Sequence, residues 1–259
     1  MKVVVTAGNT QTPIDKVRCI TNIFSGRTGT LIALEASQRG HEVCLLTSHP
    51  EVVQELSSAP PQDNSRWRVE TYRTFDDLQR LMEIEITNRH FDAIIHVAAV
   101  NDYAVAGTYS LDGHTSFDAG SLTFHAHDCS PHLVQAIGGK VKSDHSELWL
   151  RLIPTPKLVD LIRNPWGFAG TLVKFKLEVD VNETRLREIA ELSRRQSDAD
   201  MIVANTLEGM ADWALIKNRN SDFIKVPRRT LAQVVLKGVE NTVAGKTLHI
   251  EPVGNGYAA

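Results

Sequence analysis

Glycines and small polar residues near the amino terminus form the most suggestive chemical pattern in this sequence. An apolar segment at residues 2–6 leads into Gly8, and Gly26 stands just before a helical pattern at residues 28–39. A turn that leaves a buried strand and enters a helix collects unpaired backbone N–H groups at the positive end of the helix dipole. This arrangement suits a phosphate group, although glycine in the turns of any α/β sheet would look the same.

The same residues match a dinucleotide-binding fingerprint only in part. That fingerprint packs its glycines closely, whereas a long segment separates Gly8 from Gly26 here. A second predicted strand, at residues 42–46, ends in T-S-H and lacks the acidic residue that holds a ribose. A nicotinamide-dependent oxidoreductase on a Rossmann sheet loses its two main supports but stays an alternative, and we expect neither NAD nor flavin.

Composition narrows the range of partners. The chain has 259 residues, 42% of them hydrophobic, enough for one large or two small domains. A formal net charge of -3 offers no basic field for nucleic acid or a membrane surface. The odd count of cysteines without a C-x-x-C pair predicts a reducing, cytoplasmic location, and no apolar run is long enough for a membrane helix. We therefore expect small-molecule substrates.

Strands and helices alternate through the first part of the chain. Residues 50–65 read as a surface loop, and the other segments predict strands at 2–6, 42–46, 68–72 and 93–100 and helices at 28–39 and 75–89. This order predicts an α/β fold with a Rossmann-like, doubly wound, mostly parallel sheet and flanking helices. Ligands of such sheets bind beyond the carboxyl ends of the strands, so Gly8 and the segment after residue 97 should face one crevice.

The alternation breaks at residues 103–139, which we interpret as a flexible or atypical insert, with a short helix at 130–137, in a single domain spanning 1–259. Regular elements then resume. They are predicted strands at 147–152, 171–177 and 201–204, helices at 157–163, 183–196 (capped by Asn182) and 230–239, and a hairpin formed by 213–217 and 223–226.

Two further segments could contact a ligand. Ala98 and Ala99 at a strand end would allow a ligand to approach the backbone closely, and Asp102 could hold a hydroxyl, an amine or a metal-bound water. Lys140 and Lys142 follow two glycines and could swing over a phosphate. Taken singly, small residues ease packing, Asp102 could cap a turn, and such lysines are usually solvated.

The combined pattern is more specific. T-A-G-N-T-x-x-P-I-D-x-V-R-x-I-T-N-x-F-S-G-R-T-G, A-A-V-x-D-Y, K-V-K-S, F-K-L-E-V-D and I-V-A-N occur in this order. From Val3 to about Val239 the chain resembles the phosphopantothenoylcysteine synthetase (phosphopantothenate–cysteine ligase) family of coenzyme A biosynthesis, in its stand-alone bacterial form.

This resemblance implies a ligase that joins 4′-phosphopantothenate to L-cysteine. The family activates the carboxylate with a nucleoside triphosphate and Mg²⁺, releases pyrophosphate, and lets the cysteine amine attack the acyl-nucleotide. Bacterial members use CTP and eukaryotic members ATP, and we favour CTP here. The resemblance also implies a homodimer that pairs through the C-terminal hairpin. We expect the metal to bind with the triphosphate and not through protein side chains alone.

The resemblance also assigns site residues. We expect catalytic roles for Asn22, Asp102 and Lys140, nucleotide contacts from Gly8, Ser25, Gly26, Arg27, Ala98, Ala99 and Phe175, and substrate contacts from Arg18, Asn22 and Asn205. As a neutral amide, Asn22 can hydrogen-bond an acyl carbonyl without repelling the triphosphate.

Some residues depart from the family pattern. Ser143 replaces the last lysine of K-x-K-K, Asn9 replaces a glycine of the first turn, and Lys174 stands where bifunctional bacterial members carry glycine. Ser143 and the unusual segment at residues 103–139 leave a catalytically idle nucleotide-binding or regulatory relative as a third hypothesis. Within the insert, His125, His127, Cys129 and His132 are residue types that bind zinc, but without a second ligand cluster we prefer an ordinary loop.

Overall fold

The computed structural model describes residues 1–62, 66–127, 130–136, 138–142 and 144–245. The chain forms two compact units. The sheet unit comprises Met1–Thr10, Ile23–Val100 and Lys157–Ala259, and the hairpin unit comprises Gln11–Asn22 and Asn101–Pro156. A single domain over 1–259 stays a prediction.

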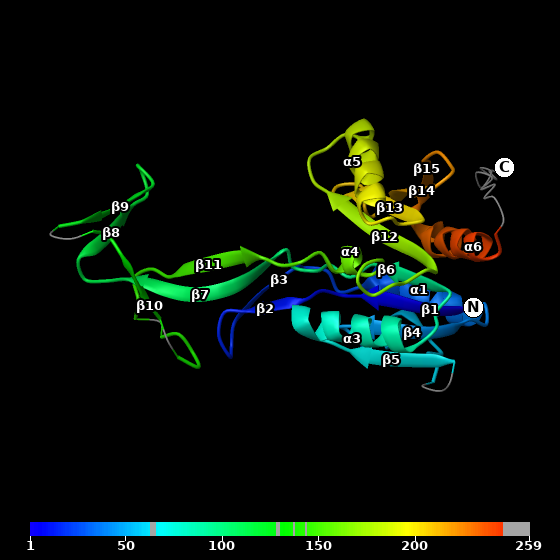
Figure 1. The fold of residues 1–259 in the computed structure, drawn as a ribbon, viewed down its shortest axis with the longest axis horizontal. Helices are drawn as coiled ribbons and strands as arrows, with labels where there is room; N and C mark the ends of the chain where they lie inside the picture. The colour runs from blue at the N-terminus through cyan, green and yellow to red at the C-terminus, as the bar shows by residue number, and fades with distance from the viewer. Residues whose placement is uncertain (63–65, 128–129, 137, 143, 246–259) are drawn as a thin grey trace. The chain divides into compact units, whose positions relative to one another are not determined.

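The sheet unit is built on an eight-stranded sheet in the order β15-β14-β13-β12-β6-β1-β4-β5 (Figure 1). The strands from β13 to β5 pair in parallel, and the hairpin of β14 and β15 adds an antiparallel edge. The predicted α/β class, mostly parallel sheet and C-terminal hairpin are confirmed. The strands are β1 (Lys2–Ala7), β4 (Glu42–Thr47), β5 (Trp67–Thr71), β6 (Ala93–His96), β12 (Thr171–Glu178), β13 (Met201–Thr206), β14 (Trp213–Asn218) and β15 (Ile224–Pro227).

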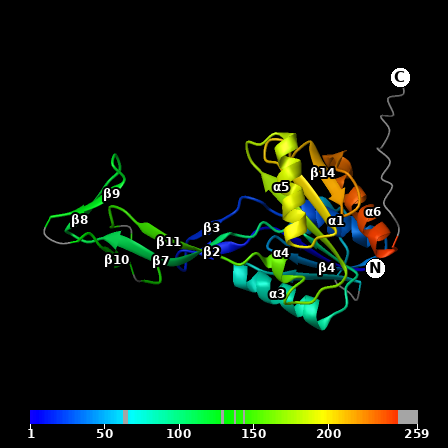
Figure 2. The ribbon, with the colours of Figure 1, turned by 45° about the horizontal axis from the view of Figure 1, so that its top comes forward.

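Helices cover both faces of this sheet (Figures 1 and 2). Val3 and Val5 of β1 belong to the core that α1 and α6 share, whereas Val4 belongs to the core formed with α3 and α4. Strands buried on both faces must be apolar throughout, which explains the continuous hydrophobic runs. The helices are α1 (Arg27–Gln38), α2 (Val52–Leu56), α3 (Phe75–Asn88), α4 (Leu158–Leu161), α5 (Glu183–Gln196), the 3₁₀ turn η1 (Arg228–Thr230) and α6 (Leu231–Val243).

Local capping explains where two helices begin. Thr74 and Asp77 form a capping box at α3, each side chain accepting the other's backbone N–H. Asn182 accepts the backbone N–H of Arg185 at α5, as predicted. Each such cap stabilises its helix by about 1 kcal/mol.

The hairpin unit consists of short antiparallel sheets. Its strands are β2 (Gln11–Pro13), β3 (Cys19–Thr21), β7 (Tyr103–Leu111), β8 (Thr115–Asp118), β9 (Thr123–Ala126), β10 (Leu133–Gln135) and β11 (Trp149–Pro154). β7 lies between β10 and β11, β2 pairs with β3, and β8 pairs with β9. The rings of Phe117, Phe124 and Trp149 pack together with centroids 4.7 to 5.1 Å apart.

The structure corrects several sequence expectations. The described residues of 103–139 form four strands, and the helix predicted at 130–137 is wrong because Leu133–Gln135 pairs with β7. Residues 50–65 include the helix α2, so they are not only a loop. The strand predicted at 93–100 ends at His96, because the next two backbone N–H groups, of Val97 and Ala98, donate to the side chain of Thr6.

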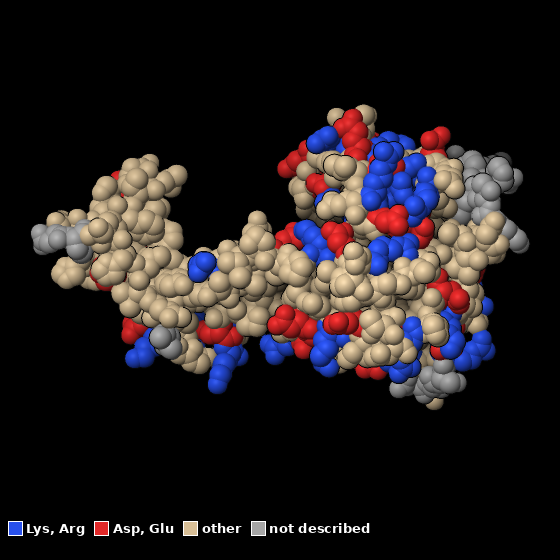
Figure 3. All heavy atoms as spheres, viewed as in Figure 1, with Lys and Arg blue, Asp and Glu red and all other residues tan. Residues whose placement is uncertain are grey.

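The viewed face of the sheet unit carries charges of both signs, while β7 and β11 present mainly uncharged side chains (Figure 3). Among the described residues, no helix combines the length and apolar character needed to cross a membrane.

Candidate functional site

Two glycine backbones pack directly against each other where β1 ends. Gly8 and Gly26 have φ values of 90° and 83°, a region that disfavours other residues. A Cβ on Gly26 would lie 2.3 Å from the backbone nitrogen of Gly8, and a Cβ on Gly8 would lie 2.1 Å from Ser48 Oγ. Only glycine fits at either position, so the start of α1 rests on the turn after β1.

The start of α1 lacks a side-chain cap. Gly26 is the N-cap and makes no side-chain hydrogen bond, and the first turn carries no acidic residue. The backbone N–H groups and the positive end of the helix dipole can therefore bind an anion. Ser25 directly precedes this N-cap, while Arg27 donates to Glu55 of α2 at 3.1 Å. Because both partners of that ion pair are half exposed, the pair contributes little to stability.

The double-alanine segment adjoins the same turn. Ala99 N donates to the Gly8 carbonyl at 2.8 Å, and Thr10 N donates to the Ala99 carbonyl at 3.2 Å. Asn9 and Ala99 form an isolated parallel bridge. The structure thus brings together Gly8, Gly26 and Ala99 within the sheet unit.

Phe175 and Asn205 lie on neighbouring parallel strands of the same unit. Phe175 of β12 pairs with Val203, and Leu177 pairs with Asn205 of β13. Phe175 is partly buried against the core of α1 and α6. β12 also pairs with β6, the strand that leads to Ala98, so these residues occupy adjacent carboxyl-terminal strand halves.

No carboxylate follows the end of β4 at residues 47–49. Thr47 closes β4, and Ser48 Oγ accepts the backbone N–H of Asn9 at 2.9 Å. His49 Nδ1 lies 2.9 Å from Ser48 Oγ. These groups brace the turn at Gly8, and no acidic side chain at residues 47–49 could hold a ribose diol.

Asn22 is oriented inside the hairpin unit by Asn101, a residue that the sequence analysis missed. Asn22 Nδ2 donates to Asn101 Oδ1 at 2.9 Å. Asn101 Nδ2 in turn donates to Thr12 Oγ1 at 2.8 Å and to the Ile20 carbonyl at 3.2 Å. Asn101 is 8% exposed, so this amide pair is firmly held. In the sequence, Asn101 occupies the variable position of A-A-V-x-D-Y, directly before Asp102. The side chain of Asp102 is exposed.

Asp15 links the β2–β3 hairpin to the segment that carries Lys140. Its carboxylate accepts the backbone N–H groups of Val17, Arg18 and Val141, and the Arg18 guanidinium at 2.6 Å. Arg18 also donates to the Val141 carbonyl at 2.7 Å. The hydrogen bonds from Arg18 and Val17 hold the pKa of Asp15 well below its usual range. Lys140 itself is exposed, and Ser143 lies outside the described residues.

Two of the candidate zinc ligands in the insert, His125 and His132, have other partners. His125 Nε2 lies 2.8 Å from Thr123 Oγ1, and His132 Nε2 lies 2.9 Å from Asp112 Oδ2. Cys129 is outside the described residues. Within the part of the chain that the structure describes, no group of three or more His, Cys, Asp or Glu side chains could hold a metal ion.

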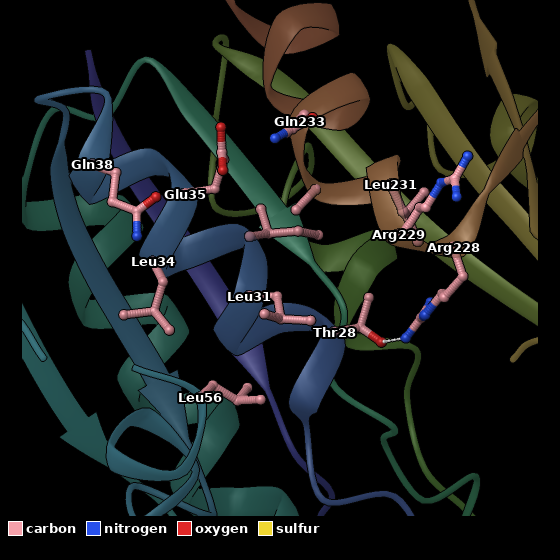
Figure 4. Close-up of a pocket in the computed structure, with 12 residues that line it drawn as sticks. Thr28, Leu31, Leu34, Glu35, Gln38, Leu56, Arg228, Arg229, Leu231 and Gln233 are labelled. Atoms are coloured by element: carbon pink, nitrogen blue, oxygen red, sulfur yellow. Dashed lines mark hydrogen bonds between the residues drawn. The ribbon is translucent and has the colours of Figure 1, made fainter. Parts of the chain in front are cut away.

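A pocket of about 290 Å³ lies beside α1, lined by residues of α1, η1 and α6 (Figure 4). Arg228 donates to Thr28 Oγ1 in the first turn of α1. Burial lowers the pKa of Arg228. Gly8, Ala98, Ala99 and Phe175 are not among its lining residues, so this pocket is separate from the turn described above.

The sequence and fold are similar to those of known coenzyme A biosynthesis proteins. Residues 1–112 match the DNA/pantothenate metabolism flavoprotein C-terminal domain family. The chain is 31% identical over 233 residues to the coenzyme A biosynthesis bifunctional protein CoaBC of Thermococcus kodakarensis, covering 88% of this chain and 47% of that protein. A second CoaBC, from Methanocaldococcus jannaschii, is 26% identical and covers 80% of this chain and 40% of that protein. The chain thus spans about half the length of the curated relatives it matches.

Solved structures agree with this result. The DNA/pantothenate metabolism flavoprotein of Streptococcus pneumoniae is 27% identical, with a TM-score of 0.72 over 93% of this chain and 99% of that chain. A Cab2 mutant in complex with phosphopantothenate-cysteine shares the fold, at 13% identity and a TM-score of 0.65, over 94% of this chain and 86% of that chain. The predicted resemblance to this coenzyme A biosynthesis family is therefore confirmed, while its stand-alone bacterial form stays a prediction.

Proposed function

From the confirmed resemblance to the phosphopantothenoylcysteine synthetase family, we propose that this chain is a phosphopantothenate–cysteine ligase. It joins 4′-phosphopantothenate to L-cysteine and converts CTP, or alternatively ATP, to the monophosphate and pyrophosphate. The observation that carries the proposal is the uncapped start of α1 packed on the Gly8 turn, with Ala99 bonded to that turn. This edge of the sheet unit suits a triphosphate.

The chemistry proceeds in two steps with a balanced exchange of groups. A carboxylate oxygen of phosphopantothenate attacks the α-phosphorus, and pyrophosphate leaves. The cysteine amine then attacks the acyl carbon, and the nucleoside monophosphate departs with that carboxylate oxygen. No covalent bond to the protein is needed, because the nucleotide supplies the activation.

Each proposed role follows from the charge that develops. N–H groups at Gly26 and the Lys140 ammonium neutralise the triphosphate, and Asn22 orients the acyl carbonyl. Bound Mg²⁺ would add positive charge; the first turn of α1 has no carboxylate, which fits a metal held by phosphate oxygens.

The remaining roles are proposed from the resemblance. Asp102 acts in catalysis, Arg18 and Asn205 contact the substrates, and Ser25, Arg27, Ala98 and Phe175 contact the nucleotide. We also propose a homodimer, with residues 1–259 working as one domain.

Pyrophosphate release tests the proposal. Purified protein with CTP, Mg²⁺, phosphopantothenate and cysteine should release pyrophosphate, and omission of phosphopantothenate should abolish the signal. The same assay with ATP measures the base preference. No pyrophosphate with either nucleotide refutes the ligase, and nucleotide binding without turnover would instead identify an idle relative.

A nicotinamide-dependent oxidoreductase is the second candidate. The Rossmann-like sheet favours it, whereas the missing carboxylate after β4 opposes it. Titration with NADH or NADPH, followed by cofactor fluorescence, separates the two functions, because only the oxidoreductase predicts saturable binding.

A further inference from the structure

A row of three buried polar side chains crosses the centre of the sheet. Thr6 of β1 pairs with His96 of β6, which pairs with Lys174 of β12. Their exposed fractions are 0%, 8% and 7%. Burial of polar groups is costly unless hydrogen bonds compensate. The hydrogen-bond partners of these three side chains therefore indicate their structural role.

Thr6 anchors the backbone that follows β6. The N–H groups of Val97 and Ala98 both donate to Thr6 Oγ1, each at 3.1 Å. His96 Nδ1 lies 2.9 Å from the same oxygen. A hydroxyl has two acceptor sites and one proton, so with both sites occupied Thr6 donates to His96 Nδ1. This arrangement requires Nδ1 of His96 to be unprotonated.

Lys174 is anchored by the two helices that cover it. Its Nζ donates to the Ser193 carbonyl at 3.0 Å and to Ser197 Oγ at 2.5 Å. Ser197 Oγ donates to Asp160 Oδ1 of α4 at 2.5 Å. These bonds fix the position of the ammonium group, whose positive charge acts on His96 of the neighbouring strand.

Burial, together with a nearby positive charge, keeps His96 neutral. Burial and the positive charge of Lys174 lower the pKa of His96 to about 4. Burial also lowers the pKa of Lys174 to about 8; Asp160 opposes this shift, while Lys176 and Lys157 add to it. Near pH 7 His96 is therefore neutral, which the unprotonated Nδ1 requires, and the hydrogen bond from Thr6 then selects the tautomer with its proton on Nε2.

We propose that Thr6 and His96 are positioning residues for the nucleoside triphosphate. They hold the backbone of Val97 and Ala98 in the form that leads into the Ala99 bridge, without touching the ligand themselves. This inference rests on the proposed function for the identity of the ligand, and it adds two residues to which no role has been assigned.

Kinetics of matched variants test the inference. Thr6→Val keeps the shape and removes the hydroxyl, Thr6→Ser restores the hydroxyl, and Thr30→Val is the control, because Thr30 is equally buried but its Oγ1 has no partner among the described residues. Thr6→Val should raise the KM for CTP about tenfold or more with kcat changed less than about twofold, and Thr6→Ser should restore KM. An unchanged KM in folded Thr6→Val, or an equal rise in Thr30→Val, overturns the inference.

A second pair of variants covers a failure of Thr6→Val to fold. His96→Leu removes the acceptor and His96→Asn retains one, so the KM should rise only in His96→Leu; equal values overturn the inference. Calorimetric titration with CTP separates this result from the proposed function. If the wild-type protein binds CTP but has no activity, the proposed ligase function is refuted and the positioning role is not. The Thr6 and His96 variants are then compared by their Kd for CTP. A wild type that binds no nucleotide overturns both.

Discussion

Alanine substitutions at glycines separate backbone strain from collision. A Cβ on Gly26 would meet both obstacles, with φ at 83° and the Gly8 nitrogen 2.3 Å away. Gly167 has φ at 71° with nothing within 4 Å, so it isolates strain. Gly29 lies in α1, and its Cβ would approach Ala7 Cβ to 2.7 Å, so it isolates collision. Gly113 meets neither obstacle and gives the baseline.

The expected losses follow from these contacts. A left-handed conformation costs alanine about 1 kcal/mol, and overpacking costs about 1 to 3 kcal/mol. Gly26→Ala should therefore lower the free energy of unfolding by about 2 to 4 kcal/mol, and Gly167→Ala by about 1 kcal/mol. Gly29→Ala should destabilise, although alanine normally stabilises a helix by about 1 kcal/mol relative to glycine.

Urea unfolding of the four variants, each compared with the parent protein, provides the measurement. Each of the four variants replaces glycine by alanine, so the conformational entropy of the unfolded chain falls by the same amount in each. The stability of Gly113→Ala therefore serves as the correction for this effect. The reasoning is refuted if Gly26→Ala loses no more stability than Gly167→Ala, since the collision with Gly8 would then be absent.

Three further predictions concern single side chains. Burial lowers the pKa of His96 from 6.5 to about 4, so the free energy of unfolding should fall by up to about 3 kcal/mol as the pH drops from 6.5 to 4. Urea unfolding should show a smaller loss in His96→Asn, which has no titrating group at this position. An equal loss in the two proteins would contradict the lowered pKa. Asp15→Asn should accelerate amide hydrogen exchange at Val141 about tenfold or more, because the carboxylate that accepts this N–H is lost; unchanged exchange argues against that anchor. Lys140→Gln should lower kcat about tenfold or more with unfolding unchanged, whereas equal effects of Lys140→Gln and the matched Lys142→Gln would exclude a specific role.

The parts of the fold that the sequence predicted are those with strong local patterns. β1, β4 and β6 are apolar because both of their faces are buried, and α5 begins at the predicted cap Asn182. In the hairpin unit the strand predicted at 147–152 overlaps β11, but the other strands were missed, because they depend on partners distant in sequence. β7 pairs with β11, and the Gly, Ser and Thr residues within β7 give no local sign of that pairing.

Site prediction had the same limit. The glycines at positions 8 and 26 were visible in the sequence, but their direct backbone contact was not. Asn101 was passed over as a variable position, although its amide orients Asn22. The signal for Thr6 and His96 was a polar residue at the carboxyl end of an otherwise apolar strand, which burial makes costly unless a partner exists.

Oxygen transfer tests the central claim most directly. Phosphopantothenate labelled with ¹⁸O in its carboxylate is incubated with the protein, cysteine, CTP and Mg²⁺, and the products are analysed by mass spectrometry. Attack of the carboxylate on the α-phosphorus predicts one ¹⁸O atom in the nucleoside monophosphate and none in pyrophosphate. Unlabelled monophosphate formed together with product would contradict the acyl-nucleotide route.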